Sequence, residues 1–328
     1  MITVTGANGL AGSYIVKEFL NRGEQVRVVV REGSDCTELE SVKEKVEWKY
    51  ADVNNYDALV DALKGSDVVI HTAAVVSYHS SDKDLMRQVN VIGTRHVVNV
   101  CLQEKVPTLL HISSVAALGK LETSTLIDET ATWIDDDTVS DYALTKHHSE
   151  LEVWRGGEEG LNIIIVNPSV ILAPTDFNKS SAQLFGYVWK EKKFYTEGAI
   201  NTIDVRDLAT CCYLLLKEKH FGERFILSHE AISYEVFFKS IANKWNKKPP
   251  SIKVSKKWML LLAKLEAIRS WLTKSKPLIT VQTARLAGRK VVYKNDKIKK
   301  ALNFEFQSIE NSIDWCCAEY MKKFENKK

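Results

Sequence analysis

A glycine-rich turn near the start of the chain constrains the fold more than any other feature. An apolar run, 1–4, precedes the turn and an amphipathic run, 13–20, follows it; the turn reads Thr5-Gly6-Ala7-Asn8-Gly9-Leu10-Ala11-Gly12. A glycine-rich connection from a strand to a helix lets the backbone approach a pyrophosphate and aims the first helix amides at it. Because the spacing is Gly-x-x-Gly-x-x-Gly and not the general Gly-x-Gly-x-x-Gly fingerprint, a second feature is needed to support this interpretation.

Strand-like and helix-like runs alternate over the first two thirds of the chain. Apolar strand-like runs cover residues 2–4, 25–30, 46–50, 68–71, 108–112 and 162–166, and helical patterns between and after them include 56–64, 83–103 and 142–153. This alternation is typical of a parallel sheet with helical crossovers. Such crossovers are right-handed and ligands bind at strand carboxyl ends, so the glycine turn, His71-Thr72-Ala73-Ala74 and Ser113-Ser114 should converge there. We predict an α/β fold with a Rossmann-type, doubly wound parallel sheet and a cofactor cleft at that edge.

Tyr142 and Lys146 are the second informative feature. Four residues apart, they share one face of a predicted helix, so an ammonium can act on a phenol. Taken alone, a Tyr-x-x-x-Lys pair is more often a pair of surface residues. Here it lies downstream of the Ser113-Ser114 strand end and upstream of Asn167-Pro168-Ser169, and these mutually placed groups indicate catalysis.

The composition agrees with a globular enzyme. The chain has 328 residues, enough for about two domains, with 45% hydrophobic and 27% charged residues. The first strand begins at Ile2, which leaves no room for a leader peptide, and the six cysteines include no Cys-x-x-Cys pair. We therefore expect a cytoplasmic protein with reduced thiols, no transmembrane segment and no metal site. The acid cluster Asp135-Asp136-Asp137 is interpreted as a solvated loop.

Positive charge is concentrated in the last third of the chain. Residues 239–328 carry 22 Lys and Arg against 7 Asp and Glu, a net +15, which leaves −12 for residues 1–238 given the total of +3. No nucleic-acid motif accompanies this charge, so we interpret it as a basic substrate lobe on an acidic cofactor domain and expect no nucleic-acid partner. The run 258–272 is amphipathic, and too short and charged to span a bilayer. We favour a core-facing or lid helix over peripheral membrane contact there.

Taken in order along residues 1–217, the motifs resemble those of the extended short-chain dehydrogenase/reductases, the NAD-dependent epimerase/dehydratase superfamily. They are TGANGLAG, Asp52-Val53, HTAA, Asn90 in VNVIGT, Ser113-Ser114, Tyr142-x-x-x-Lys146 and Asn167-Pro168-Ser169-Val170. The stretch NPSVILAP is similar to the Pro-x-x-Val-x-Gly-Pro motif of the dihydroflavonol reductase, cinnamoyl-CoA reductase and 3β-hydroxysteroid dehydrogenase branch, with Ala173 where glycine is usual. The plant cinnamoyl-CoA reductase signature is absent, so a phenylpropanoid thioester substrate is not supported.

The resemblance assigns roles to the residues of the proposed catalytic site. Tyr142 would be the acid in reduction and the base in oxidation, and Lys146 would lower its pKa and hold the nicotinamide ribose. Ser114, with Ser113 as the alternative, would hydrogen-bond the carbonyl oxygen of the substrate. Asn90 resembles the asparagine that supports a proton-relay water, although an asparagine there can also cap or kink its helix.

The end of the second strand decides the cofactor prediction. A dinucleotide site specific for NAD usually has an acidic residue there, whereas this chain has Arg31, which favours the 2′-phosphate of NADP; Glu32 keeps NAD as the alternative. The residues predicted to bind the cofactor are Gly6, Asn8, Gly9, Leu10, Ala11, Gly12, Arg31, Asp52, Val53, His71, Thr72, Ala73, Ala74, Tyr142, Lys146, Asn167, Pro168, Ser169 and Val170.

These observations predict a two-lobed, NADP(H)-dependent oxidoreductase that interconverts a small-molecule carbonyl and a secondary alcohol. Residues 1–167 and 201–217 are expected to form the Rossmann domain, and residues 168–200 and 221–328 a smaller, discontinuous substrate lobe. A nucleotide-sugar epimerase or dehydratase with tightly held NAD is the first alternative, and a non-catalytic dinucleotide sensor is the second. The oligomeric state stays open, with a homodimer as one alternative.

Overall fold

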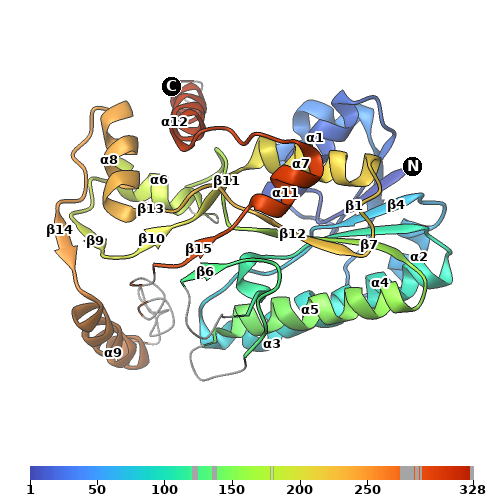
Figure 1. Cartoon of the computed structure of the whole chain (residues 1–328), viewed down its shortest axis with the longest axis horizontal. Coiled ribbons are helices and arrows are strands. Elements are labelled where there is room, and N and C mark those ends of the chain that lie inside the picture. The colour runs from blue at the N-terminus through green and yellow to red at the C-terminus, as the bar shows by residue number, and fades with distance from the viewer. Residues whose placement is uncertain are drawn as a thin grey trace.

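The structure, a computed structural model, describes residues 1–119, 125–134, 139–177, 179, 181–273, 284, 288 and 290–325. A sheet flanked by helices forms the larger part, and a smaller lobe lies to one side of it (Figure 1). The acid cluster at 135–137 lies outside the described residues.

The main sheet has seven parallel strands in the order β12-β7-β5-β4-β1-β2-β3. Six of them match the strand-like runs of the sequence, and the first five agree to within one residue at each end. The prediction of a doubly wound α/β sheet is therefore confirmed. The strands are β1 (Ile2–Thr5), β2 (Val26–Val30), β3 (Glu47–Tyr50), β4 (Val68–His71), β5 (Thr108–Ile112), β7 (Asn162–Pro168) and β12 (Glu223–Leu227).

Helices cover both faces of the sheet because its strands are apolar on both sides. In β5, Leu110 and Ile112 enter one hydrophobic core, while Leu109 enters the other. The first core contains helices α1 (Leu10–Asn21), α7 (Val205–Lys217) and α11 (Asp296–Leu302). The second contains α2 (Tyr56–Leu63), α4 (Gly93–Gln103) and α5 (Asp141–Glu158). The predicted helix 83–103 is observed as α3 (Lys83–Met86), a π-helical segment (Arg87–Ile92) and α4.

The smaller lobe has a core of its own, which is rich in aromatic side chains. Three helices supply the aromatic residues that pack together there: Phe185, Phe237 and Tyr320 lie within the helices, and Trp245 directly follows the helix that contains Phe237. The helices are α6 (Ala182–Trp189), α8 (Tyr234–Lys244) and α12 (Ile309–Glu325); two-stranded sheets pair β10 (Ala199–Ile200) with β13 (Ile232–Ser233), and β14 (Ile252–Val254) with β9 (Phe194–Thr196). Two further pairs join β11 (Thr202–Asp204) to β8 (Val170–Leu172), and β15 (Val292–Tyr293) to β6 (Leu126–Ile127).

The second segment of the lobe, predicted to begin at residue 221, begins later in the sequence. Residues 221–328 were assigned to it, but β12 pairs in parallel with β7 and is the edge strand of the main sheet. Phe225, Ile226 and Leu227 are buried there, because α7 forms a crossover that returns the chain to the sheet. Helix α11 also packs against the main sheet, where Ile298 and Leu302 join the first core. The lobe boundary at 221 is corrected accordingly.

Helix α9 (Lys256–Thr273) differs from the core-facing helix that the sequence favoured. It lies at the far end of the lobe (Figure 1), and its apolar residues Trp258, Leu261, Leu262 and Leu265 are exposed. Trp258 retains 63% and Leu265 55% of their accessible surface. The core-facing interpretation is therefore wrong, and the lid role stays a prediction. Within the described part of the chain, no helix is both long and apolar enough to cross a membrane.

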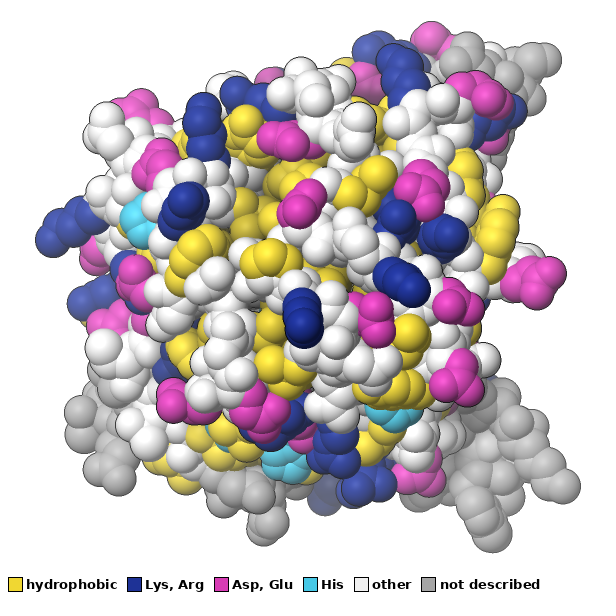
Figure 2. All heavy atoms as spheres, turned by 90° about the vertical axis from the view of Figure 1, so that its right-hand side faces the viewer, with side chains coloured by type: hydrophobic (Ala, Val, Ile, Leu, Met, Phe, Trp, Pro, Cys, Tyr) yellow, Lys and Arg dark blue, Asp and Glu magenta, His cyan; other side chains and the backbone are white. Residues whose placement is uncertain are grey.

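On the end of the molecule opposite the lobe, the described residues carry charges of both signs. Figure 2 shows Lys and Arg side chains interspersed with Asp and Glu on this face, with apolar side chains between them. Among the described residues this face therefore carries mixed charge, whereas a long polyanion such as nucleic acid binds best where positive charge is continuous.

Candidate active site

The glycine turn connects β1 to α1 in a conformation that requires glycine. Gly6 has a φ of +67°, and a Cβ atom at this position would lie 2.6 Å from the backbone of Ala73. A Cβ at Gly12 would lie 2.5 Å from the Gly6 carbonyl oxygen. Gly9 is the N-cap of α1 and offers no side chain to its first amides. The turn therefore presents backbone N–H groups at a helix N-terminus, as a pyrophosphate requires.

Hydrogen bonds to the residues that follow β2 and β4 hold the turn in place. Asn8 donates from Nδ2 to the carbonyl of Asp35, 3.0 Å away, which connects the turn to the loop after β2. Thr72, directly after β4, donates from Oγ1 to the carbonyl oxygens of Thr5 (2.8 Å) and Gly6 (3.1 Å). Asn8 and Thr72 thus act on the turn itself, and Ala73 forms the wall against which Gly6 packs.

Arg31 directly follows β2, and its side chain is exposed. With Ser34, Lys43 and Tyr50, among others, it lines an open hollow of about 460 Å³ beside the strand ends. Charged groups of either sign are present, since Glu40 pairs with Lys43 at the same place.

Asp52 and Val53, after β3, have separate roles in the structure. Asp52 accepts a hydrogen bond from the backbone N–H of Asn54 (2.8 Å), which closes a turn. Val53 is buried, and a Cβ at Gly93 of α4 would lie 2.6 Å from its side chain. Val53 therefore packs closely against the start of α4.

His71 is buried in a polar chain and does not face the cleft with its ring. Its Nδ1 pairs with Thr5 Oγ1 (2.7 Å) and its Nε2 with Thr94 Oγ1 (3.0 Å), while the ring stacks on His111. Burial, with a smaller contribution from the Lys146 charge, lowers the pKa of His71 to about 3. His71 is thus a neutral structural residue at neutral pH, and only its backbone is available to a cofactor.

Asn90 lies in the π-helical segment, a feature frequent at functional sites. Its Oδ1 accepts from the Val75 amide (2.7 Å), and its Nδ2 donates to the Val75 carbonyl (2.9 Å) and to Thr145 Oγ1 (3.1 Å). Both amide protons are therefore engaged within the protein. These bonds hold the segment after β4 against α5. The Asn90 side chain therefore has a structural role here, and its predicted support of a relay water stays a prediction.

Ser114 and Tyr142 meet at the carboxyl end of the sheet. Tyr142 is buried and forms a hydrogen bond with Ser114, and that bond lowers the pKa of the phenol slightly. Burial has the larger effect, and it raises the pKa of Tyr142 well above its ordinary value. Ser113, the alternative serine, donates instead to Glu150 Oε1 at 2.5 Å. Tyr78 packs edge-on against Tyr142 with ring centroids 6.0 Å apart, a contact that the sequence did not indicate.

Lys146 is 2% exposed and donates from Nζ to the carbonyl of Ile112 at 2.9 Å. Burial lowers its pKa to about 8, against the opposing effect of Glu150. We expected the Lys146 ammonium to lower the pKa of Tyr142, and that expectation is wrong for this structure. The physical reason is that the phenol loses its hydration on burial, while the ammonium is held by the Ile112 carbonyl.

Asn167 lies near the end of β7, and Ser169 directly follows the strand. Asn167 donates from Nδ2 to the Ser114 carbonyl (3.0 Å) and to Glu150 Oε1 (2.5 Å). Its Oδ1 and the Ser169 hydroxyl are buried and have no hydrogen-bond partner among the described residues. Pro168 is the last residue of β7, and Val170, the first of β8, is partly exposed.

Together these features fit a dinucleotide at the carboxyl ends of the strands. The glycine turn offers backbone amides at the N-terminus of α1, and two buried polar atoms near the catalytic group have no hydrogen-bond partner in the described part of the chain. The structure also adds Glu150 to the site, a residue absent from the sequence prediction. The signal was present, because Tyr142, Lys146 and Glu150 follow one another at intervals of four on a helix.

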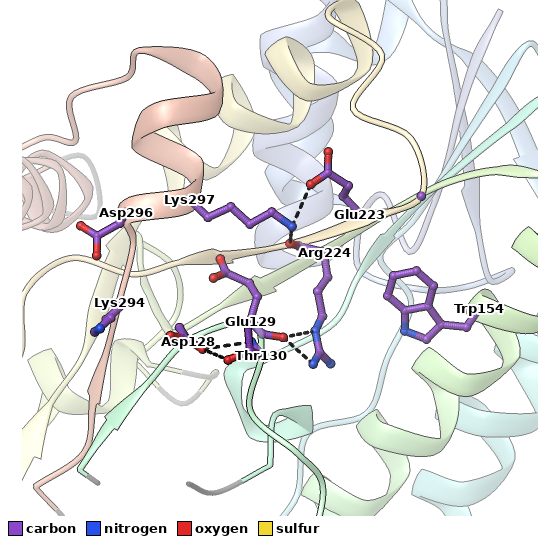
Figure 3. A pocket seen from close by; sticks show the side chains of 10 residues that line it. Asp128, Glu129, Thr130, Trp154, Glu223, Arg224, Lys294, Asp296 and Lys297 are labelled. Carbon is purple, nitrogen blue, oxygen red and sulfur yellow. Dashed lines mark hydrogen bonds and ion pairs between the residues drawn. The ribbon is translucent and has the colours of Figure 1, made fainter.

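A separate hollow of about 770 Å³ lies beside the edge strand β12 (Figure 3), and Tyr142 is not among the residues that line it. Its charged residues largely pair with one another: Arg224 donates to the Glu129 carbonyl, and Lys297 contacts Glu223 at 2.9 Å. Glu129 also accepts from the Ile226 amide at 2.9 Å, which caps part of the free strand edge. Glu129 thus covers part of the edge strand, as exposed sheet edges usually require. This hollow is distinct from the proposed catalytic site around Tyr142.

Comparisons with known proteins agree with the geometry. Residues 2–227 match the NAD dependent epimerase/dehydratase family. Sterol demethylase protein B of Methylococcus capsulatus is 32% identical over 229 residues, 69% of this chain and 69% of that protein. A putative dihydroflavonol 4-reductase of Synechocystis is 29% identical over 238 residues, 71% of this chain and 68% of that protein. The crystal structure of gox2253 covers 99% of this chain and 98% of that chain, with a TM-score of 0.85 and 28% identity.

The gox2253 structure shares the described fold over nearly the whole chain, and the Synechocystis relative is named as a putative reductase of the branch that the motifs indicated. The chain therefore belongs to the NAD dependent epimerase/dehydratase family, within the extended short-chain dehydrogenase/reductases, and is an oxidoreductase that uses a nicotinamide dinucleotide.

Proposed function

We propose that this protein is an NADP(H)-dependent reductase that interconverts a carbonyl and a secondary alcohol, with Ser114, Tyr142 and Lys146 as the catalytic residues. The observation that carries the proposal is the Ser114–Tyr142 hydrogen bond, with Lys146 one helical turn along the same face. A bound nicotinamide would supply or accept the hydride.

Tyr142 carries its proton at neutral pH, as an ordinary phenol does, and can donate it to a substrate oxygen as charge develops there. Burial raises the pKa of this phenol, so the proton leaves only when a bound substrate provides a strong acceptor. Ser114, which hydrogen-bonds the same hydroxyl, is placed to orient that oxygen. Lys146 is buried one helical turn from Tyr142, and its Nζ is held by the Ile112 carbonyl; its proposed role is to hold the ribose of a bound nicotinamide nucleotide.

The choice of NADP rests on Arg31. An exposed guanidinium at the end of β2 favours a 2′-phosphate through charge-assisted hydrogen bonds. The hollow that Arg31 lines, at the ends of β2 and β3, has room for such a group. A carboxylate at position 31 would instead favour the free ribose hydroxyls of NAD.

The test is a panel of aromatic, steroid-like and aliphatic carbonyls incubated with the purified protein and NADPH or NADH. We expect one class of carbonyl to cause net loss of NADPH absorbance, with NADH less effective. An epimerase would give a different result, because it returns its dinucleotide unchanged in each cycle. Isomerisation of a nucleotide sugar without net consumption of either nucleotide would contradict the proposed function.

A further inference from the structure

Glu150 occupies an unusual position for a carboxylate. It is 2% exposed, and it lies one helical turn beyond Lys146 on α5, the helix that carries Tyr142. A buried carboxylate is costly unless charges and hydrogen bonds compensate for its lost hydration. The contacts of Glu150 therefore indicate its structural role.

The Glu150 carboxylate joins α5 to three adjacent strands. Its Oε1 accepts from Ser113, directly after β5, and from Asn167 of β7, each at 2.5 Å. Its Oε2 lies 3.6 Å from Nη1 of Arg224 on β12. In the sheet these strands are neighbours, in the order β12-β7-β5. One side chain thus fixes the position of α5 over the strand ends.

The same contacts reach the proposed catalytic residues. Asn167 donates to Glu150 and also to the carbonyl of Ser114, so the carboxylate and the serine share one amide. Lys146 donates to the carbonyl of Ile112, one residue before Ser113. A movement of α5 relative to β5 would therefore disturb the Ser114–Tyr142 hydrogen bond and the Lys146 contact together.

Arg224 is held in place on the other side of the carboxylate. Its guanidinium donates to the Glu129 carbonyl at 3.0 Å and 2.6 Å and to the Ala131 carbonyl at 3.3 Å. Figure 3 shows this side chain extending from β12 toward Glu129. Arg224 is therefore a fixed positive charge that accompanies Glu150, and not a mobile surface residue.

We propose that Glu150 is the positioning residue of this site: its buried carboxylate locks α5 onto β5, β7 and β12 and presents a negative charge to Lys146. The proposal rests on the proposed function, in which Lys146 acts as an ammonium. Among the described residues, the charged or titratable groups that interact with the Lys146 charge are Glu150 on α5, His71 on β4 and His111 on β5, and Tyr142 lies one helical turn before Lys146.

The expected pH effect follows from the signs of these charges. The Glu150 carboxylate raises the pKa of Lys146, which burial lowers to about 8. Removing the negative charge lowers the pKa of Lys146 further. In Glu150→Gln, the loss of activity and of NADPH affinity with rising pH should therefore begin about one pH unit lower than in the wild type. Turnover at the optimum should also fall by about tenfold or more, because α5 is displaced.

Two further variants separate charge from reach and test the specificity of the effect. Glu150→Asp keeps the negative charge but shortens the side chain, so turnover should fall. Because the charge is kept, the loss of activity at high pH should begin within roughly a few tenths of a pH unit of its wild-type position. The matched control is Glu152→Gln, which removes another carboxylate of α5, one that pairs with Arg95 of α4 and with Arg155 of α5. It should move neither the limb nor the turnover.

The readouts are the pH profiles of kcat and of NADPH affinity by fluorescence, with thermal melts to confirm folding. A wild-type limb and wild-type turnover in Glu150→Gln would overturn the proposal. If that variant does not fold, Glu150→Asp decides: wild-type turnover in the folded Asp variant overturns the proposal, and a tenfold loss supports it. NADPH affinity can be measured whichever reaction the site performs, so failure of the reductase proposal is distinguishable from failure of this one.

Discussion

At the scale of single residues, Arg31 is the clearest determinant of cofactor choice. Its side chain is exposed beside the end of β2, where a 2′-phosphate would be recognised. We predict that Arg31→Ala weakens NADPH binding by about ten- to a hundredfold and leaves NADH binding nearly unchanged. Fluorescence titrations with both nucleotides measure this difference. Equal losses for the two nucleotides would show that Arg31 does not read the phosphate.

The residues of the site could be predicted from the sequence to different extents. Ser114, Tyr142 and Lys146 carry a recognisable spacing, and the structure brings them to one strand edge. The raised pKa of the Tyr142 phenol could not be predicted, because it depends on burial. Tyr78 was also missed, since its contact with Tyr142 joins a loop to a helix. Such contacts have no signature in local sequence.

At the scale of secondary-structure elements, β4 and β5 bring two histidines together in the interior. His71 and His111 are paired in register, and their rings stack with centroids 5.3 Å apart. Burial lowers the pKa of His71 to about 3 and that of His111 well below its ordinary value. Both histidines are therefore neutral in the folded protein over a pH range in which the unfolded chain binds protons.

This pair predicts acid sensitivity of the fold. Between the ordinary pKa of 6.5 and the folded value of about 3, the unfolded chain binds a proton at His71 that the folded protein does not. The free energy of unfolding should therefore fall as the pH drops through this window, by about 1.4 kcal/mol per pH unit for each such histidine. In His71→Asn, denaturant unfolding between pH 4 and 6 should show a shallower pH dependence by about that amount.

The exposed His148 provides the control for this experiment. His148→Asn removes an exposed imidazole and leaves the buried His71–His111 pair intact, so it controls for the loss of a histidine as such. The same slope in wild type and His71→Asn would mean that His71 takes up a proton inside the folded protein, and would contradict its neutral, buried state.

Elements of regular pattern were predictable, and those set by the tertiary fold were not. The strands β1 to β5 follow local apolar runs, and the observed bounds agree with the expected ones. Helix α9 was judged from its amphipathic pattern alone, which does not reveal whether the apolar face meets a core. The sequence prediction places β12 in the lobe, because nothing in its local pattern shows that it pairs with β7. That pairing depends on the crossover through α7, which returns the chain to the main sheet.

At the scale of the whole molecule, the charge asymmetry raises the question of an anionic partner. Residues 239–328 have a net charge of +15, and the rest of the chain has −12. We predict that duplex DNA binds only weakly at physiological salt, with the steep salt dependence of counterion release. Electrophoretic mobility or anisotropy titrations at several salt concentrations measure this. Sequence-selective binding that persists at raised salt would contradict the interpretation of the charge as a feature of the substrate lobe.

The whole-molecule architecture was predictable in outline because the order of motifs implies the order of strands. Alternating strands and helices with right-handed crossovers leave few topologies, and the seven-stranded parallel sheet is one of them. The lobe was less predictable. Its aromatic core joins α6, α8 and α12, which are far apart in the sequence, and no local period links them.

The central claim is that Tyr142 donates the proton in a carbonyl reduction, and Tyr142→Phe tests it most directly. The substitution removes the hydroxyl that bonds Ser114 but keeps the ring that packs on Tyr78. NADPH should bind as in the wild type, while turnover of the carbonyl found active in the panel should fall about 100-fold or more. Lys146→Met should lose both turnover and affinity. Near wild-type turnover in Tyr142→Phe, measured by NADPH absorbance, would contradict the reductase mechanism.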